Sequence, residues 1–414
     1  MNWSEATTLT ITCGRGCASA LRKELCALGY SPFELSPTAI GVEGNMHDAM
    51  RLNLWLRTAN RVLFEMMGFE ARTTDELYAA VTDLPWEEWL AEGVPFHIHG
   101  DAHAEELRDP RFALLRCKDA VADRFVRATG ARPDSQSDPE GAACIALHWQ
   151  AGEAHVHLDT SGIPLSRRGY RWRPWIAPLR ENLAASILVE ADWQPDHEAL
   201  AGPMCGSGTL SIEAAWMAQR RAPGLHREAY AFQSLRDWPA GDWRELKEEA
   251  RRQFRPVPAA WISATDSDAR AVACAQENAS RAGVEKLIRF GTADFRKAPL
   301  PPPPALIAMN PEYGERMGFA ETLAPLYAAM GDDLKARCTG MRAAVFTGNP
   351  ELARQIGLHP SRRIPMWNGA LECRLLLYDL YAGTRDRRLL RKHSDGAKNA
   401  ASSSSAADSA TACE

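Results

Sequence analysis

One short segment constrains the fold of this 414-residue chain more than any other: the glycine-rich run Pro203-Met204-Cys205-Gly206-Ser207-Gly208-Thr209. An apolar strand pattern over 199–201 precedes it, and a helical pattern that reaches about Arg220 follows. Glycines in such a turn let the backbone approach a ligand, and the start of the following helix offers unpaired N–H groups. A glycine pair alone is a weak signal. Its position between a strand and a helix is where α/β sheets bind nucleotides.

Acidic residues stand at the ends of the next two predicted strands, 261–265 and 288–291. Asp266 ends the first strand, and Asp294 follows the second. Asp266 lies 58 residues after Gly208, whereas about 20 separate the equivalent positions of a dinucleotide-binding fold. We therefore interpret 223–258, rich in Trp, Arg and Glu, as an insertion. Each acid alone is more often a helix N-cap than a ligand, but three strand ends in register favour a shared ligand site.

The chain is too long for one hydrophobic core and indicates two or three domains. Its last large region alternates strand and helix, which predicts an α/β, doubly wound sheet. Residues 46–160 mix strands and helices without βαβ repetition, which predicts a mostly antiparallel sheet with helices on one side. The region before them reads strand, helix, strand, which is a small α+β pattern. The expected organisation is two α+β units, 1–45 and 46–160, a basic linker, 161–180, the α/β domain, 181–384, and a basic, then disordered tail, 385–414.

Composition excludes little, and the net charge of −5 neither indicates nor excludes a nucleic-acid partner. The ten cysteines show no Cys-x-x-Cys pair, which favours reduced thiols and a cytoplasmic protein. No stretch approaches the roughly 20 apolar residues of a membrane span. His97, His99, His155 and His157 alternate on two predicted strands; sheet position explains their spacing, so we expect no metal.

A second turn interrupts the apolar strand 305–309 and reads Asn310-Pro311-Glu312-Tyr313. Asn-Pro pairs are common turn formers, and a turn is the simplest interpretation. The alternative concerns exocyclic amines, whose lone pair is conjugated with the base. The Asn310 side-chain oxygen and the Pro311 carbonyl would accept both N–H groups of such an amine, and Tyr313 would stack on the extruded base. Beside the glycine-rich turn, this second interpretation is favoured.

Both turns, in this order and separation, resemble those of the bacterial RNA guanine-N2 methyltransferases that carry an N-terminal THUMP domain, and most closely the enzymes acting on 23S ribosomal RNA. The similarity covers the chain except its tail and includes 167–171, 177–184 and 368–373. It implies a ferredoxin-like piece, a THUMP RNA-binding domain and a Rossmann-like class I methyltransferase domain. S-adenosylmethionine is the implied cofactor and RNA the implied partner.

The resemblance also implies roles for single residues. Asp266 would hold the ribose of the cofactor, and Asp294 would lie near its adenine. The other implied cofactor contacts are Glu181, Asn182, Pro203, Met204, Gly206, Ser207, Gly208 and Thr209. Asn310, Pro311 and Tyr313 would hold the guanine amine in line with the methyl sulfonium.

The chain departs from the family pattern at two positions. Gly202 stands where the family usually has an acid that would hold the cofactor's ammonium group, and Glu312 stands where it usually repeats proline. Loss of one charge-assisted hydrogen bond costs about 1.5–3 kcal/mol, and an unpaired charge in a water-poor pocket is costly. These departures predict weakened or absent turnover on the expected architecture.

Basic and aromatic residues alternate in the linker, as Arg167, Arg168, Tyr170, Arg171 and Arg173. Such a pattern suits RNA phosphates and bases, although a solvated linker explains it equally well. The favoured function is guanine-N2 methylation of 23S ribosomal RNA. The alternatives are the same chemistry on transfer RNA and a non-catalytic RNA-binding or ribosome-assembly protein of this fold. DNA adenine-N6 methylation shares the second turn, but the N-terminal region favours RNA.

Overall fold

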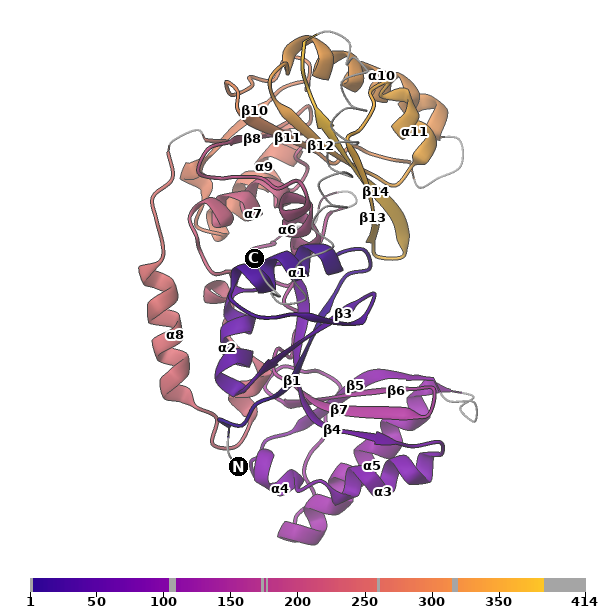
Figure 1. Cartoon of the computed structure of the whole chain (residues 1–414). Helices are drawn as coiled ribbons and strands as arrows, with labels where there is room; N and C mark the ends of the chain where they lie inside the picture. Colours follow the sequence, from indigo (N-terminus) through magenta and orange to yellow (C-terminus); the bar gives the residue numbers. More distant parts are fainter. Residues whose placement is uncertain are drawn as a thin grey trace, which may run out of the picture.

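The computed structural model describes residues 3–103, 109–172, 175, 178–258, 261–314 and 319–382. Arg173 and the tail expected over 385–414 lie outside these residues. The described chain contains two seven-stranded sheets, which lie one above the other in an elongated molecule (Figure 1). Within the described residues, no helix is both long and apolar enough to cross a membrane.

The N-terminal sheet is shared by the first two α+β units. Its strand order is β2-β3-β1-β4-β7-β6-β5, and every pair is antiparallel except β5–β6. The twelve-residue β4 pairs with β1 on one side and β7 on the other, which joins the two units into one sheet. The strands are β1 (Thr7–Cys13), β2 (Phe33–Ser36), β3 (Ala39–Gly44), β4 (Ala59–Glu70), β5 (Phe96–His103), β6 (Ala143–Gln150) and β7 (Glu153–Asp159).

Side-chain caps fix where several helices of this region begin. Asn45 accepts a hydrogen bond from the Asp48 amide, and Thr73 accepts one from the Glu76 amide, each in a capping box. Asp109 caps the longest helix of the region, which has proline at its first position. The helices are α1 (Ala18–Ala27), α2 (Met46–Trp55), α3 (Thr74–Asp83), α4 (Trp86–Trp89) and α5 (Pro110–Thr129).

The C-terminal sheet has the strand order β10-β9-β8-β11-β12-β14-β13. Its first five strands are parallel, and helices cover both faces, so β8 and β11 are buried along their whole length. This confirms the predicted doubly wound sheet. The strands are β8 (Ala199–Pro203), β9 (Ile262–Asp266), β10 (Ile288–Thr292), β11 (Ala305–Met309), β12 (Arg342–Thr347), β13 (Arg362–Asn368) and β14 (Leu371–Asp379); the helices are α6 (Glu181–Glu190), α7 (Thr209–Ala218), α9 (Ala269–Arg281), α10 (Phe319–Arg337) and α11 (Pro350–Gln355), with η3 (Glu285–Leu287) before β10.

The direction in which successive strands are added to this sheet reverses between β8 and β11, although the two strands are parallel. From β8 the order runs outward through β9 to β10, and from β11 it runs the other way. The two central strands pair in register, with Ala199 opposite Ala305 and Ala201 opposite Ile307. A doubly wound sheet binds ligands at the carboxyl ends of the strands at such a switch point. The glycine-rich turn and the Asn310 turn therefore meet at one edge of the sheet.

One edge strand, β13, was not among the strands that the sequence pattern indicated. It begins with Arg362 and Arg363 and contains Pro365, and only one of its seven residues, Met366, is buried. Polar residues and proline are tolerated at an edge because the outer row of backbone groups needs no partner. The strand forms a tight hairpin with β14, which the apolar core holds in place.

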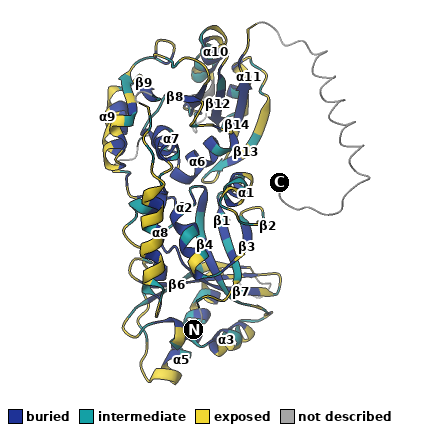
Figure 2. Ribbon diagram, turned by 60° about the vertical axis from the view of Figure 1, so that its left-hand side comes forward, coloured by how far each residue is buried: buried dark blue, intermediate teal, exposed yellow. Residues whose placement is uncertain are grey.

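The predicted insertion, 223–258, contacts both halves of the molecule. It forms η1 (Pro223–His226), η2 (Ala231–Ser234) and α8 (Ala240–Arg252). The Phe232 amide donates to the Thr160 carbonyl (3.2 Å), and Leu235 forms a bridge with Leu90 of the N-terminal region. The buried side of helix α8, which includes Trp243, packs toward α2. Its other side faces solvent (Figure 2). One hydrophobic core consequently runs through both sheets.

Candidate active site

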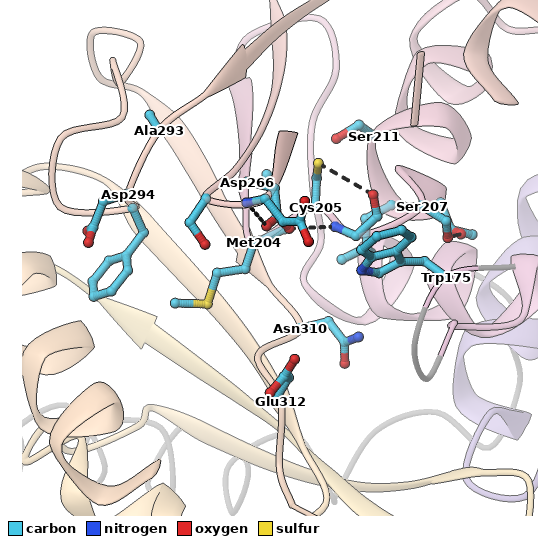
Figure 3. Close-up of a pocket in the computed structure, with 18 of the residues that line it drawn as sticks. Trp175, Met204, Cys205, Ser207, Ser211, Asp266, Ala293, Asp294, Asn310 and Glu312 are labelled. Carbon is cyan, nitrogen blue, oxygen red and sulfur yellow. Dashed lines mark hydrogen bonds between the residues drawn. The ribbon is translucent and has the colours of Figure 1, made fainter. Parts of the chain in front are cut away.

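The switch point opens into a cavity of about 520 Å³, which we call the main cavity (Figure 3). This volume is within the range of small-molecule and cofactor sites. The glycine-rich turn forms one wall, the ends of β9 and β10 a second, and the Asn310 turn a third. Of the residues predicted for the site, those that line it are Met204, Gly206, Ser207, Thr209, Asp266, Asp294 and Asn310.

The glycine-rich turn folds tightly because three of its residues adopt left-handed backbone conformations: Met204 (φ 58°), Gly206 (φ 52°) and Gly208 (φ 80°). This region is uncommon for a residue with a side chain, so Met204 carries local strain. A Cβ on Gly208 would come within 2.9 Å of the Ala275 Cβ, so glycine here allows α7 to lie against α9. The turn thereby directs its backbone and the Met204 side chain into the main cavity (Figure 3).

Two residues that are not in the turn hold it from behind. The Arg171 guanidinium donates to the Ser207 Oγ (3.3 Å), the Thr209 Oγ1 (3.1 Å) and the Leu179 carbonyl (2.7 Å). It also pairs with the Glu181 carboxylate, Nε to Oε1, at 2.9 Å. The buried Asn278 of α9 donates to the Ser207 carbonyl at 3.0 Å. These contacts fix the hydroxyls and carbonyl of the turn before any ligand arrives.

Acidic side chains line the opposite wall. The Asp266 carboxylate accepts the Gly206 amide at 3.0 Å through Oδ2 and the Asp268 amide at 3.0 Å through Oδ1. Each carboxylate oxygen keeps a second lone pair for a hydroxyl donor. Asp294 is paired with Arg296, whose side-chain hydrogen bonds lower the pKa of the Asp294 carboxyl to about 2. Asp294 is therefore ionised at neutral pH, and the wall is rich in hydrogen-bond acceptors.

The Asn310 turn presents an unused acceptor. Asn310 follows the fully buried β11 and lines the main cavity. Its Oδ1 atom is buried and has no hydrogen-bond partner within the described part of the chain. A buried amide oxygen without a partner costs about 1–3 kcal/mol. Such an atom at the edge of a ligand cavity marks a place for an N–H or O–H donor.

The other residues of this turn lie differently from what the sequence suggested. Pro311 and Tyr313 are buried and are not among the described residues that line the main cavity. The Tyr313 hydroxyl accepts a hydrogen bond from the Asn368 amide nitrogen at 3.0 Å, and its ring packs against Gly348. Tyr313 offers no stacking face to the cavity in this conformation. Glu312 does line the cavity but is exposed, so the expected burial of its charge is wrong.

Two predicted cofactor contacts face another hollow. Glu181 is engaged by Arg171, and Asn182 donates to the Asn60 Oδ1 at 2.8 Å. Neither is among the described residues that line the main cavity, because the first turn of α6 faces the N-terminal sheet. Pro203 and Gly208 also lie behind the cavity wall, where they shape the turn.

The predicted RNA segment divides into buried and exposed residues. Arg168 is only 1% exposed and lies 3.5 Å from the Glu213 carboxylate, while the Tyr170 hydroxyl donates to the same carboxylate at 3.1 Å. Arg171 is occupied behind the glycine-rich turn. Direct RNA contact by Arg168 and Tyr170 conflicts with their burial, and the partly buried Arg171 guanidinium is already engaged by Glu181 and the glycine-rich turn. Only Arg167 of the described members is exposed.

Several lining residues had no recognisable signal in the sequence. Trp175, from the basic linker, stands over the glycine-rich turn, with its Cδ1 3.6 Å from where a Gly206 Cβ would lie. Phe295 follows Asp294 and adds an apolar wall. Cys205 of the glycine-rich turn also lines the cavity, and burial raises the pKa of its thiol well above the ordinary value, which makes it a poor nucleophile. Packing between distant segments, which no local motif encodes, brings these residues to the cavity.

Two of the four alternating histidines pair with acids across the N-terminal sheet. His99 Nε2 lies 2.9 Å from the Asp159 Oδ2, and His155 Nδ1 lies 2.7 Å from the Glu65 Oε1. Among the described residues, no group of three or more histidine, cysteine or acidic side chains is arranged to hold a metal ion.

Comparison with known families identifies three parts of the chain. Residues 8–63 match the RlmL ferredoxin-like domain, 71–138 the THUMP domain, and 168–376 the RMKL-like methyltransferase domain. The last match covers just over half of the chain. The expected ferredoxin-like, THUMP and class I methyltransferase folds are thereby confirmed.

Curated relatives carry the name ribosomal RNA large subunit methyltransferase K/L. The protein from Syntrophotalea carbinolica is 40% identical over 383 residues, which cover 89% of this chain and 53% of that protein. The protein from Pseudomonas aeruginosa strain PAO1 is 36% identical over 379 residues, which cover 89% of this chain and 52% of that protein. The chain thus spans about half the length of the curated relatives it matches.

Solved structures share the whole fold. SMU.472, in complex with S-adenosylhomocysteine, is 27% identical with a TM-score of 0.81, and the match covers 92% of this chain and all of that one. A predicted N6-adenine-specific DNA methylase from Listeria monocytogenes is 28% identical with a TM-score of 0.81, covering 91% and 97%. S-adenosylmethionine is the cofactor that such a methyltransferase fold implies. From the domain match and the geometry of the switch point, the chain belongs to the RMKL-like methyltransferase family.

Proposed function

We propose that this chain methylates the N2 amine of a guanine in 23S ribosomal RNA, with S-adenosylmethionine bound in the main cavity. The observation that carries the proposal is the buried, unpartnered Oδ1 of Asn310, which lies at the switch point beside the glycine-rich turn. An acceptor at this place suits an exocyclic amine, which must be held and oriented before it can react.

The residues of the main cavity fit the cofactor. The lone pairs that Asp266 retains suit ribose hydroxyls, and the Phe295 ring supplies an apolar surface for an adenine. The Ser207 and Thr209 hydroxyls, oriented by Arg171, lie where the glycine-rich turn opens into the cavity. When bound, S-adenosylmethionine supplies an electrophilic methyl group on a sulfonium carrying positive charge. The described residues that line the cavity include four acids and one arginine, which is itself paired, and this excess of negative charge suits such a cation.

The proposed work of the Asn310 turn is to position the amine. The Asn310 Oδ1 would accept one N–H of the guanine amine and the Pro311 carbonyl the other, which orients the nitrogen lone pair. Proton loss from the methylated amine needs an acceptor, and the exposed carboxylate of Glu312 lies on the same wall. Because Tyr313 is buried against Gly348, stacking of the base by Tyr313 would require the turn to move.

The THUMP domain match over residues 71–138 supports RNA as the substrate. Large-subunit ribosomal RNA is favoured over transfer RNA because the curated relatives are named for it. Since the chain spans only about half of those relatives, the substrate remains part of the proposal. A cytoplasmic location also belongs to it and is supported by the free thiols of the described cysteines.

The test uses the purified chain with S-adenosylmethionine labelled in its methyl group. Protein-free 23S ribosomal RNA and transfer RNA are offered separately, and the modified RNA is digested to nucleosides for mass spectrometry. We expect N2-methylguanosine from the ribosomal RNA alone.

Incorporation into transfer RNA alone would overturn the ribosomal assignment. Methyladenosine in place of N2-methylguanosine would overturn the choice of base while leaving the amine-positioning role of Asn310 intact. Binding of S-adenosylhomocysteine without incorporation into either RNA would favour a non-catalytic RNA-binding protein of this fold.

A further inference from the structure

Next to the main cavity along the chain, residues 180–183 line two further hollows of about 160 and 480 Å³ at the junction of the two sheets. The hollows share Asn60 and Arg180, so they form one continuous surface. We call this surface the arginine groove and define it by Arg15, Asn60, Arg61, Arg167 and Arg180. Its smaller hollow is lined by residues just after β1, at the start of α6 and at the β13–β14 turn; Figure 1 shows the β13–β14 hairpin beside α1.

The groove is basic although the whole chain is acidic. The chain has 53 acidic and 48 basic residues, yet the groove is lined by four arginines and a single carboxylate, that of Glu181. Arg171 already neutralises Glu181. The groove consequently keeps an excess of positive charge.

Three of its arginines have no opposing charge. Arg61 pairs with Asp159, but Arg15, Arg167 and Arg180 are exposed and form no ion pair within the described residues. Guanidinium groups recognise phosphates through paired hydrogen bonds. Three such groups along one surface favour a polyanion over a single small anion.

Asn182 provides an independent sign of a ligand. It is 3% exposed and lines the smaller hollow, and its amide nitrogen is used by Asn60. Its Oδ1 is buried without a hydrogen-bond partner in the described part of the chain. A donor such as a ribose 2′-hydroxyl or a base amino group would satisfy this oxygen, and both occur in RNA.

The groove also contains an aromatic surface that leads toward the Asn310 turn. The Arg15 guanidinium lies 4.1 Å from the centre of the Trp367 ring, and Trp367 lines the smaller hollow. Bases stack readily on such arginine–aromatic surfaces. The next residue, Asn368, donates to the Tyr313 hydroxyl at 3.0 Å. One end of the groove is thus connected to the turn that carries Asn310.

We propose that the arginine groove binds the backbone of the single-stranded RNA segment that contains the target base. Arg15, Arg167 and Arg180 contact successive phosphates, and Asn182 accepts a hydrogen bond from the RNA strand. The proposal rests on the proposed function for the identity of the polyanion as RNA, and it adds the route by which the base reaches the main cavity.

The test measures binding of a fluorescein-labelled oligouridylate of about 20 nucleotides, long enough to cross the groove, at salt concentrations between about 50 and 200 mM. The full chain is compared with the triple variant Arg15→Ala, Arg167→Ala, Arg180→Ala. The matched control is Arg289→Ala, an exposed arginine on β10 at the opposite edge of the C-terminal sheet. Thermal melting and S-adenosylhomocysteine titration establish that each variant folds and keeps its main cavity.

We expect the triple variant to lose affinity about 10- to 100-fold and to flatten the plot of log affinity against log salt by about 2, since each phosphate contact to a single strand contributes about 0.7. Asn182→Ala should weaken RNA binding without changing that slope. The control should match the unaltered chain.

Equal affinity and slope in the triple variant and the unaltered chain would overturn the proposal that the groove binds RNA. Failure of the unaltered chain to bind the oligonucleotide would overturn it as well. Absence of methyl transfer with groove-dependent binding intact would instead overturn the proposed function and leave the groove standing.

Discussion

The main cavity and the arginine groove are neighbours with opposite character. Pro178 and Leu179 line the first, and Arg180 lines the second. The main cavity is lined by four acids and a paired arginine, whereas the groove is lined by four arginines and a paired acid. In the proposed assignment, a cationic cofactor and an anionic RNA each meet a surface of the opposite sign. This separation explains how a chain of net charge −5 can be suited to both.

The cofactor side and the proposed substrate side of the molecule also differ in how far their polar groups are paired before binding. The glycine-rich turn has its hydroxyls and carbonyl held by Arg171 and Asn278. On the proposed substrate side, Asn310 in the main cavity and Asn182 in the groove each have a buried oxygen with no partner among the described residues. The glycine-rich turn is therefore preorganised, whereas the Asn310 and Asn182 oxygens would gain hydrogen-bond donors only from a ligand.

The largest expected effect is on the rate of methyl transfer, and it leaves both binding surfaces intact. Asn310→Ala removes the acceptor of the amine, and we expect the rate of methyl transfer to fall on the order of 10²–10³-fold. S-adenosylhomocysteine affinity and RNA affinity should remain within about twofold. Single-turnover kinetics with saturating RNA would measure this. A comparable loss of cofactor affinity would instead show that Asn310 belongs to the cofactor wall.

Removal of the support behind the glycine-rich turn should weaken cofactor binding and destabilise the fold. Arg171→Ala leaves the Glu181 carboxylate buried without its partner, and we expect the free energy of unfolding to fall by about 3 kcal/mol. S-adenosylhomocysteine should bind about tenfold more weakly, because the Ser207 and Thr209 hydroxyls lose their orientation.

Urea unfolding and calorimetric titration give these two quantities. Arg171→Lys is the matched control: it keeps the charge but not the fork of donors, so it should recover only part of both losses. An unchanged cofactor affinity in a folded Arg171→Ala protein would contradict the positioning role of Arg171.

Restoring the family's acid at position 202 should meet a steric obstacle that the sequence does not reveal. A Cβ on Gly202 would lie 2.8 Å from the Ser211 Oγ and 3.3 Å from the Ser263 carbonyl oxygen. We expect Gly202→Asp to destabilise the chain by about 1–3 kcal/mol. Adding Ser211→Ala should recover stability and, if the carboxylate reaches the cofactor's ammonium, tighten S-adenosylhomocysteine binding about tenfold.

A Gly202→Asp protein that was stable and bound the cofactor more tightly would contradict this steric obstacle. In that case the glycine at position 202 would have cost the chain a cofactor contact, and close packing around position 202 would not require it.

The smallest effect concerns the charge of the main cavity at low pH. The pKa of Asp294 is about 2 in the folded chain because Arg296 donates to it, and an unfolded aspartate has a pKa of about 3.9. The pair therefore stabilises the fold above pH about 4, and this contribution is lost as the pH falls toward about 2. Arg296→Ala should raise the pKa of Asp294 toward its ordinary value, which carboxyl NMR titration would measure. Stability at neutral pH should change little, because both side chains are partly solvated.

The sequence was sufficient to predict the architecture. Buried strands such as 305–309 are continuous apolar runs, and the glycine-rich and Asn-Pro turns each follow one directly. These local patterns predicted the doubly wound sheet and placed Met204, Asp266 and Asn310 at one edge, and in the structure all three line one cavity. They did not reveal β13, because a polar edge strand has no buried alternation to recognise.

Local sequence determined which backbone turns this chain can make, since Gly206 and Gly208 permit conformations that other residues resist. The tertiary structure decided which charges those turns face. Arg167, Arg168 and Arg171 look alike in one basic linker, yet packing buries Arg168, places Arg171 behind the cofactor wall and leaves Arg167 in the groove. The reason is physical: the role of a charged side chain depends on burial and partners, and segments far apart in the sequence supply both.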